Sequence, residues 1–356
     1  MSNRFETYNL KVALTKDCNY DCEYCGGSKR RDLFPVPGKM EDFRAEPIST
    51  GSISTDQLLL LLGNFRRHGF AGIRPTGGEP TLRRDWDVIV EKTAEMGFKG
   101  VDITTNGSLL TQYLDRNNGK LPRGLSTVKV SLDTCDADEF RRITRGGDLN
   151  EVAKGIELIA NQVWVRANVV LIRSNSEPEK IARLLNFCHD LGMKQVQFLD
   201  LVYYSNLPGV DSEAWEREFV AWPEFYRIIN KIYPGIKFDL KIPEPVGVNF
   251  YSSILDNGLI VTFKDSTVTS RDLECDNCPI YCQEGRCLIR VGTDGNVTPC
   301  PDYEAKLWHF NGPSSIQDGT FDDQIDRIRR IVEESERLPT LETFARRHNL
   351  CLPEEH

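Results

Sequence analysis

The sequence predicts an α/β protein: a partial, open (βα)6 TIM barrel followed by a small cysteine-rich C-terminal domain. Short apolar strands alternate with amphipathic helical stretches, six such units occur before about residue 203, and a second dense cysteine group lies at 275–300. Strict alternation of strands and helices indicates parallel strands joined by helices. Six units are fewer than a closed eight-unit barrel needs, so we expect an open barrel with functional residues at the carboxyl ends of its strands.

The barrel elements follow from hydrophobic periodicity and from residues that begin or end helices. The expected strands are Leu10–Leu14, Gly72–Pro75, Gly100–Thr104, Thr127–Leu132, Val163–Leu171 and Gln195–Leu199. The expected helices are Thr55–His68, Arg84–Met96, Glu139–Thr144, Leu149–Asn161 and Pro178–Leu191. Ser54 or Thr55 is expected to cap the first helix, and Gly69, Gly97 and Gly192 stand where three helices should end.

The rhythm changes after about residue 203. Trp215–Tyr233 is expected to be one helix, Lys237–Ile242 a strand, and Phe321–Arg337 an amphipathic closing helix. The residues 288–298 read as a strand–turn–strand hairpin because Asp294-Gly295 is a strong turn signal. We therefore expect a barrel core of residues 1–205, a bridging segment of 206–256 and a C-terminal domain of 257–356.

The composition is that of an ordinary globular protein, with 40% hydrophobic and 27% charged residues among 356. A net charge of −9 disfavours a broad nucleic-acid or membrane-binding surface. No apolar run has the length of a membrane span, and the first residues lack the pattern of a secretory signal. Most of the 11 cysteines fall into two groups at ligand spacing, which indicates metal sites in a reducing cytoplasm and not disulfides.

Cys18, Cys22 and Cys25 form a CxxxCxxC pattern directly after the first expected strand. Three thiolates on one loop can hold three irons of a 4Fe–4S cluster and leave the fourth iron open, which suits binding of a small molecule. The alternative is a zinc loop, but zinc sites usually combine two cysteine or histidine pairs. No fourth cysteine or histidine lies nearby in the sequence, so the spacing favours the cluster.

A second motif, Arg74-Pro-Thr-Gly-Gly-Glu-Pro80, ends the second expected strand. Gly77 and Gly78 permit a close approach of the backbone to a ligand, Glu79 can accept a hydrogen bond from an ammonium group, and Pro80 fixes the turn. Together with the cysteine loop, this motif resembles the radical S-adenosylmethionine (SAM) superfamily. The resemblance implies that SAM binds the open iron and that the Gly-Gly-Glu-Pro segment holds its amino group.

Two further strand ends carry small polar side chains, in Thr104-Thr-Asn-Gly107 and Ser131-Leu-Asp133. Each alone could be a helix N-cap. Together with the two stronger motifs they favour ligand contacts at the carboxyl end of a barrel, with Asn106, Ser131 and Asp133 beside the cofactor.

Over residues 8–200 the chain resembles the GTP 3′,8-cyclase family of molybdenum-cofactor biosynthesis. The stretches that carry this likeness are 15–25, 74–80, 104–107, 131–134, 139–145 and 165–170. The resemblance implies that Tyr24, Gly78 and Ser131 contact SAM, and that Val202 takes the place of a methionine near SAM.

The same resemblance implies substrate contacts for Lys11, Arg74, Thr105, Arg166 and Arg290. Lys11 replaces an arginine of the family and Arg166 replaces a lysine, and these two side chains differ in shape although both are cationic. The chain also ends without the Gly-Gly tail of the cyclases. These departures predict the machinery of the cyclase acting on a different substrate.

The second cysteine group resembles the auxiliary-cluster region called a twitch or SPASM domain. There a CxxC pair, a strand–Asp-Gly–strand hairpin and a Cys-Pro complete another 4Fe–4S cluster. The resemblance implies that the ligands are Cys275, Cys278, Cys282 and Cys300, with Cys287 as a rival for Cys282. Zinc at this second group is an alternative.

The function implied by the resemblance is reductive cleavage of SAM to a 5′-deoxyadenosyl radical, which abstracts hydrogen from the substrate. Cationic side chains from several strands predict an anionic small molecule, nucleotide-like or sugar-like, that undergoes cyclisation, oxidation or rearrangement. The implied partner is an electron donor such as flavodoxin or ferredoxin.

Two other functions remain open at this point. Modification of a ribosomal peptide is the first, disfavoured because the chain begins almost at its first strand. A non-catalytic iron–sulfur or zinc protein is the second, disfavoured by the Gly-Gly-Glu-Pro and Ser-Leu-Asp segments.

Overall fold

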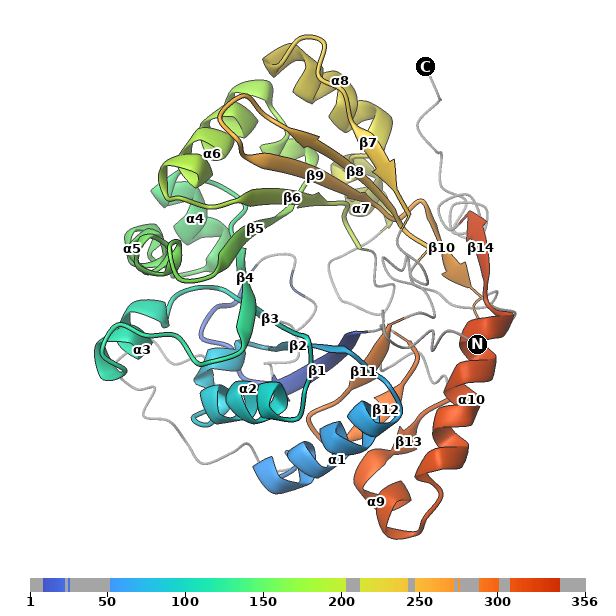
Figure 1. Cartoon of the computed structure of the whole chain (residues 1–356). Helices are drawn as coiled ribbons and strands as arrows, with labels where there is room; N and C mark the ends of the chain where they lie inside the picture. Colours follow the sequence, from blue (N-terminus) through green and yellow to red (C-terminus); the bar gives the residue numbers. More distant parts are fainter. Residues whose placement is uncertain are drawn as a thin grey trace.

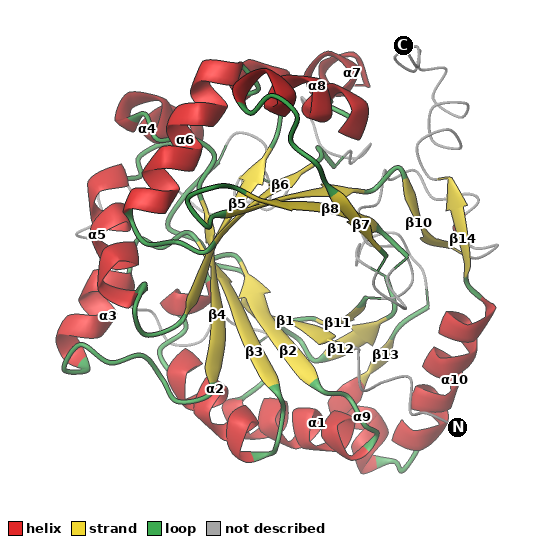
Figure 2. Ribbon diagram, turned by 45° about the horizontal axis from the view of Figure 1, so that its top comes forward, coloured by secondary structure: helices red, strands yellow, loops and turns green. Residues whose placement is uncertain are grey.

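The structure, a computed structural model, describes residues 9–22, 25, 52–202, 212–242, 247–271, 275, 288–300 and 308–339. Its centre is a strongly curved sheet whose helices lie on the outer side (Figure 1). Figure 2 shows the strands as an incomplete ring inside an arc of helices. Within the described ranges, no helix has both the length and the apolarity to cross a membrane.

Six parallel strands form the barrel in the order of the sequence. They are β1 (Asn9–Thr15), β2 (Gly72–Gly77), β3 (Gly100–Thr105), β4 (Leu125–Ser131), β5 (Trp164–Val170) and β6 (Gln195–Leu199). All six were expected from the sequence to within two residues at each end, and the partial (βα)6 barrel is confirmed.

The helices on the outer side bury the apolar residues of alternate strand positions. They are α1 (Thr55–Arg67), α2 (Trp86–Glu95), α3 (Leu110–Arg116), α4 (Ala137–Thr144), α5 (Leu149–Ile159) and α6 (Pro178–Asp190). Ser54 caps α1 through a capping box with Gln57. Gly69, Gly97 and Gly192 follow α1, α2 and α6 with positive φ, as helix-ending glycines should.

The sheet extends past both edges of the six-stranded barrel. Beside β6 lie β9 (Ile260–Asp265), β8 (Asn249–Ile254) and β7 (Asp239–Lys241), of which β9 is parallel to β6. Beside β1 lie β11 (Ile289–Val291), β12 (Asn296–Thr298) and β13 (Phe310–Asn311), of which β11 is parallel to β1. One sheet therefore includes residues from all three segments expected from the sequence.

Three helical regions differ from the sequence-based expectation. Trp215–Tyr233 is not one helix but belongs to α7 (Ser212–Glu218) and α8 (Trp222–Ile232), because proline in the first turn of α8 begins a new helix. The closing helix α10 (Phe321–Glu334) ends three residues before the expected Arg337, which lies in strand β14 (Glu336–Pro339). Helix α3 was not expected at all.

The C-terminal elements pack against the start of the barrel. The ring of Phe321 in α10 meets that of Phe65 in α1 edge-on at 5.3 Å, and His68 lies 2.9 Å from Asp322. The helix α9 (Gly312–Gln317) leads into α10, and strand β14 pairs with β10 (Val268–Arg271) in a separate small sheet.

Candidate active site on the barrel

The cysteine loop leaves the carboxyl end of β1. Cys18 and Cys22 are half-buried and Cys25 is exposed. The amide of Cys25 donates to the carbonyl oxygen of Cys22 at 3.1 Å, and the amide of Tyr20 donates to the sulfur of Cys18 at 3.4 Å. Tyr24, which the sequence also placed beside SAM, lies outside the described residues.

The three thiols form one electrostatic group. Burial raises the pKa of the Cys22 thiol, and negative charge on Cys25, Asp133 and Cys18 raises it further. In the part of the chain that the structure describes, no three thiols, carboxylates or imidazoles are placed to share a single metal ion. A 4Fe–4S cluster attaches each cysteine to a different iron. Three thiols on one loop, two of which act electrostatically on the third, Cys22, fit such a cluster as the donor set.

The glycines of the Gly-Gly-Glu-Pro segment pack on the backbone that leads into the cysteine loop. An added Cβ on Gly77 would lie 2.2 Å from the carbonyl oxygen of Thr15, and one on Gly78 would lie 2.1 Å from that of Asp17. The amides of Gly78 and Glu79 donate to these same two oxygens, at 2.9 and 2.7 Å. The close approach that required glycine here is to the cysteine loop itself.

Glu79 joins the ends of β2 and β3. Its carboxylate is 1% exposed and accepts hydrogen bonds from the amide and hydroxyl of Thr81, the hydroxyl of Thr105 and the amide of Asn106, at 2.5–3.1 Å. Burial raises its pKa, and these donors oppose that rise. Three of these donors reach Oε1 and one reaches Oε2, so Oε2 retains capacity for a further donor. A contact of Glu79 with an ammonium group stays a prediction.

Asn106 links that cradle to the cysteine loop. Its amide nitrogen Nδ2 donates to Asn19 Oδ1 at 2.8 Å and approaches the sulfur of Cys18 at 3.9 Å, while its Oδ1 accepts from Ser108. Hydrogen bonds to cysteine sulfur tune the potential of an iron–sulfur cluster. The sequence selected Asn106 but not Ser108, two residues further along the same turn, or Asn19, which only the fold brings to it.

The end of β4 lies beside the same loop. Asp133 is 8% exposed and its Oδ1 accepts from the amide of Val170 at 2.7 Å, which ties β4 to β5. Burial raises the pKa of Asp133 to about 7. Ser131 is exposed at the last position of β4, and Val202 is half-buried after β6. Their contacts with SAM remain predictions.

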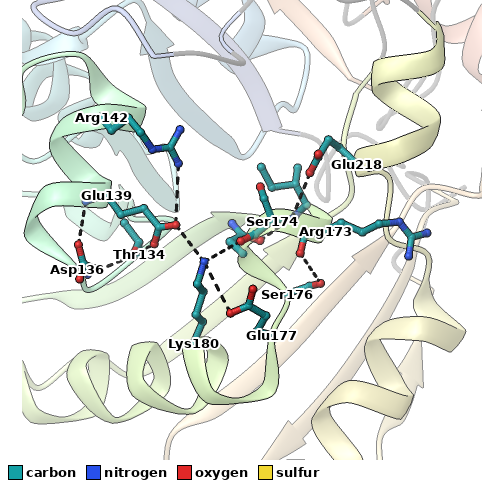
Figure 3. Close-up of polar contacts among 12 residues, drawn as sticks. Thr134, Asp136, Glu139, Arg142, Arg173, Ser174, Ser176, Glu177, Lys180 and Glu218 are labelled. Carbon is teal, nitrogen blue, oxygen red and sulfur yellow. Dashed lines mark hydrogen bonds and ion pairs between the residues drawn. The ribbon is translucent and has the colours of Figure 1, made fainter.

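The loops that follow β4 and β5 are braced by a polar network (Figure 3). Glu139 accepts from the hydroxyl of Thr134 at 2.6 Å and from Lys180 at 3.3 Å. Lys180 also donates to the carbonyl oxygen of Ser174 at 2.9 Å, and the amide of Ser174 donates to Glu218 at 3.2 Å. These groups are partly exposed, so each contact contributes little by itself, but together they position the strand ends.

A row of cations crosses the sheet on its inner face. In register, Lys11 of β1 lies between Arg290 of β11 and Arg74 of β2, and Lys129 of β4 lies beside Arg166 of β5. We call these five residues the basic cluster. Their strand neighbours on both sides are apolar and buried against the helices, so the cations face the inside of the barrel.

Two members of the basic cluster have unused donors. Nε of Arg74 and Nε of Arg290 are buried and lack a hydrogen-bond partner within the described ranges. Burial and the charge of Arg74 lower the pKa of Arg166 to about 10. Buried donors without partners and mutually repelling cations both fit a site that an anion would complete.

Lys129 and Asp102 are functional candidates that the sequence did not single out. Lys129 is 5% exposed and its Nζ lies 2.7 Å from Oδ2 of Asp102 in β3. Their positions in β4 and β3 look like ordinary strand alternation, and the parallel strand register places Lys129 beside Arg166 and diagonally opposite Asp102. The feature of the sequence that could have revealed Lys129 is its position on the same strand face as the expected substrate arginines.

The remaining residues expected from the sequence are Thr105 and the second cysteine group. Thr105 is 2% exposed and its hydroxyl serves Glu79, so the structure puts it in the carboxylate cradle and not in the basic cluster. Cys275 and Cys300 are buried, and Arg271 donates to the carbonyl oxygen of Cys275 at 2.7 Å. The other three cysteines of the second group, Cys278, Cys282 and Cys287, lie outside the described residues.

Comparison with known sequences identifies relatives. A sequence model described as the radical SAM superfamily matches residues 12–188, from β1 to the end of α6. Molybdenum cofactor biosynthesis protein 1 of Dictyostelium discoideum is 28% identical over 92% of this chain and 46% of its own length. A GTP 3′,8-cyclase of Limosilactobacillus fermentum is 30% identical over 60% of this chain and 58% of its own. This chain therefore spans about half the length of those relatives.

A third relative is matched over most of its length. A protein of Archaeoglobus fulgidus named as a probable GTP 3′,8-cyclase is 36% identical over 82% of this chain and 85% of its own. Solved structures of Streptococcus suis SuiB, one bound to S-adenosylmethionine and one to the precursor peptide SuiA, each give a TM-score of 0.56. They are 16% and 15% identical, cover 89% of this chain and 66% and 65% of SuiB, and so show the fold alone. On the superfamily match and the Archaeoglobus relative, the chain belongs to the radical SAM superfamily.

Proposed function

We propose that this chain is a radical SAM enzyme that acts on an anionic, nucleotide-like or sugar-like small molecule. Cys18, Cys22 and Cys25 would hold the 4Fe–4S cluster, and the ends of β2, β3 and β4 would hold SAM, through Gly78, Asn106 and Ser131 among others. When bound, the cluster and SAM supply one-electron cleavage and a 5′-deoxyadenosyl radical. The residues of the chain bind and orient the substrate and keep water from the reacting carbon.

The basic cluster is the observation that carries the substrate class. Five cations lie on one face of the sheet, and Asp102 pairs with one of them, Lys129. Unused Nε donors on Arg74 and Arg290 can bind phosphate or carboxylate oxygens. A ligand with two or more negative charges would relieve the repulsion between these side chains.

The names of the relatives support a nucleotide among such ligands. Several are named GTP 3′,8-cyclase, and GTP carries three phosphates. Lys11 stands where the resemblance implied an arginine, and Arg166 stands where it implied a lysine. The positive charge is retained at both positions, but the hydrogen-bonding geometry differs. We therefore propose an anionic nucleotide or sugar phosphate as the class of substrate and leave GTP as the first compound to test.

We propose an auxiliary 4Fe–4S cluster on Cys275, Cys278, Cys282 and Cys300, with Cys287 as the alternative to Cys282. The buried positions of Cys275 and Cys300 support it, as does the hairpin of β11 and β12 that precedes Cys300. Iron analysis of the reconstituted chain would test this: about eight irons indicate two clusters and about four indicate one. Zinc found at this group would contradict it.

The proposed reaction is tested by anaerobic reconstitution of the full chain with iron and sulfide, followed by addition of SAM and a low-potential reductant such as reduced flavodoxin or ferredoxin. We expect 5′-deoxyadenosine, and more of it when an accepted nucleotide is present. Cys18→Ala should abolish it, whereas Cys188→Ala, in the core of α6, should retain it. A reconstituted chain that forms no 5′-deoxyadenosine would indicate the non-catalytic iron–sulfur or zinc protein.

The second candidate substrate is a ribosomal peptide. The observation that favours it is the fold shared with SuiB, one structure of which holds a precursor peptide. Trials with GTP, other nucleotides and sugar phosphates separate the two candidates, because a peptide-modifying enzyme would show no stimulation of 5′-deoxyadenosine formation by any of these anions.

A further inference from the structure

Lys129 has an unusual environment for a lysine. Its side chain is buried inside the barrel, and within the described residues it forms an ion pair with Asp102, 2.7 Å away. The charged groups that act on it come from three neighbouring strands: Arg74 from β2, Asp102 from β3 and Arg166 from β5. Two guanidinium groups and one ammonium group thus share one carboxylate.

This arrangement makes the charge of Lys129 conditional. Burial and the charges of Arg74 and Arg166 lower its pKa from 10.5 to about 7, although Asp102 opposes the shift. Asp102 itself has a lowered pKa because Lys129 and Arg74 stabilise its ionised form against burial, so it stays ionised. Arginine stays charged at neutral pH. Among these four groups, only Lys129 changes charge near pH 7.

We propose that Lys129 is a proton-loading residue of the anion site: it takes up a proton from solvent when an anion binds beside Arg74 and Arg166, and Asp102 positions its amine. This inference rests on the anion site of the proposed function and adds a residue and a protonation step to it. The incoming negative charge would balance the three cations, which the single carboxylate of Asp102 cannot do alone. The proton goes to Nζ of Lys129, and no other bond changes.

Because anion binding and proton uptake are coupled, the proposal predicts how the affinity for an anion changes with pH. Above about pH 7 the free protein holds Lys129 largely neutral, so binding must take up a proton and the affinity for an anion falls as pH rises, by up to roughly tenfold per pH unit. Below that pH the amine is already charged, so the affinity becomes flat and proton uptake disappears. A lysine that serves only as a structural partner of Asp102 would produce neither effect.

Sulfate is the probe, because its charge does not change between about pH 6 and about pH 9, so any proton taken up belongs to the protein. Titration calorimetry of the full chain with its cluster, in several buffers of different ionisation enthalpy, measures affinity and proton uptake together. For the wild-type chain we expect uptake of up to about one proton per sulfate above pH 7, and an affinity that falls with pH.

Three variants isolate Lys129. Lys129→Met should bind sulfate weakly, without proton uptake due to this site and without the corresponding pH slope. Lys129→Arg should bind sulfate with an affinity that stays high to about pH 9, because arginine does not lose its charge there. The control is Lys92→Met, which removes an exposed lysine paired with Glu95 and should match the wild-type chain. Any contribution of Asp133, which also titrates near pH 7, persists in all of these variants.

Asp102→Asn provides an independent check. Removing the carboxylate that supports the charged amine lowers the pKa of Lys129 further. The fall of sulfate affinity should therefore begin at a lower pH than in the wild-type chain. This variant also keeps the proposal testable if Lys129→Met does not fold.

The outcomes separate this inference from the proposed function. Sulfate binding that is independent of pH and buffer in the wild-type chain would overturn the role of Lys129 and leave the anion site standing. A pH slope that persists unchanged in Lys129→Met would overturn it as well. If Arg74→Ala binds sulfate with the same affinity as the wild-type chain, the anion site itself is contradicted, and this inference with it.

Discussion

Gly78 and Asp17 are packed so closely that a β-carbon on the glycine would lie 2.1 Å from the carbonyl oxygen of the aspartate. The end of β2 therefore supports the cysteine loop by direct backbone contact, with hydrogen bonds from Gly78 and Glu79 to Thr15 and Asp17. The position of the loop depends on the absence of a side chain at residue 78.

Gly78→Ala should therefore displace the cysteine loop. The overpacking should lower the free energy of unfolding by about 1–3 kcal/mol and reduce the iron retained per chain after reconstitution. Gly63→Ala is the matched control, because an added β-carbon there meets nothing closer than Met96 at 4.0 Å. Normal iron content in Gly78→Ala would show that the loop tolerates the displacement.

Glu79→Gln should destabilise the joint between β2 and β3. The glutamine has the same shape but turns one acceptor into a donor, which would face backbone amides or hydroxyls that now lack an acceptor. We expect the free energy of unfolding to fall by about 1–3 kcal/mol, measured by urea denaturation. Glu95→Gln, at an exposed side chain paired with Lys92, should change it little. Equal stability of the two variants would mean that the cradle contributes nothing.

Arg74→Ala should abolish substrate turnover and leave slow, uncoupled formation of 5′-deoxyadenosine. The variant removes a cation of the basic cluster but none of the cysteine loop, so SAM cleavage and substrate binding separate. Product and 5′-deoxyadenosine are measured in the same reaction by chromatography. Arg123→Ala, with a side chain 82% exposed, is the control. Unchanged turnover in Arg74→Ala would exclude a substrate role for this arginine.

Lys129→Met should alter the pH dependence of stability. Between about pH 7 and pH 10.5 the unfolded chain keeps a proton that folded Lys129 has lost, so the free energy of unfolding of the wild-type chain rises with pH across that window. The variant lacks this rise, so its stability relative to the wild-type chain is greatest at or below about pH 7 and declines toward pH 10.5.

The size of that effect is about 1.4 kcal/mol for each unit by which the pKa is lowered. Urea denaturation of both proteins at a series of pH values measures it, with Lys92→Met as the reference for an exposed lysine. A constant difference between Lys129→Met and the wild-type chain at every pH would show that Lys129 has an ordinary pKa.

The barrel was predictable because its signals are local. Apolar strands, Ser54 at the start of α1 and glycines with positive φ after three helices all act within a few residues. The pairing of β9 with β6 and of β11 with β1 was not predictable, because nothing near Ile260 or Ile289 encodes a distant partner. Helix α3 was missed because it is short and no capping side chain marks its start, whereas Asp136 caps the similarly short α4.

The candidate site likewise contains residues that were predictable from local sequence and residues that were not. Cys18, Cys22 and Cys25 and the Gly-Gly-Glu-Pro segment are contiguous, so spacing alone revealed them. Lys129 and Asp102 come from separate strands, and each looks like an ordinary polar position of an alternating strand. Their pairing depends on the register of β3 against β4, which places the two side chains diagonally opposite each other on adjacent strands.

The parallel pairing of β1 with β11 also has a consequence for synthesis of the chain. Leu10 finds its partner Ile289 only after all six strands of the barrel have been translated. At roughly 5–20 residues per second the outer edge of β1 waits on the order of tens of seconds on the ribosome. During that time it is an unprotected strand edge, and such edges attract other strands. Nascent chains stalled before residue 289 should therefore depend on chaperones more than chains stalled beyond β12.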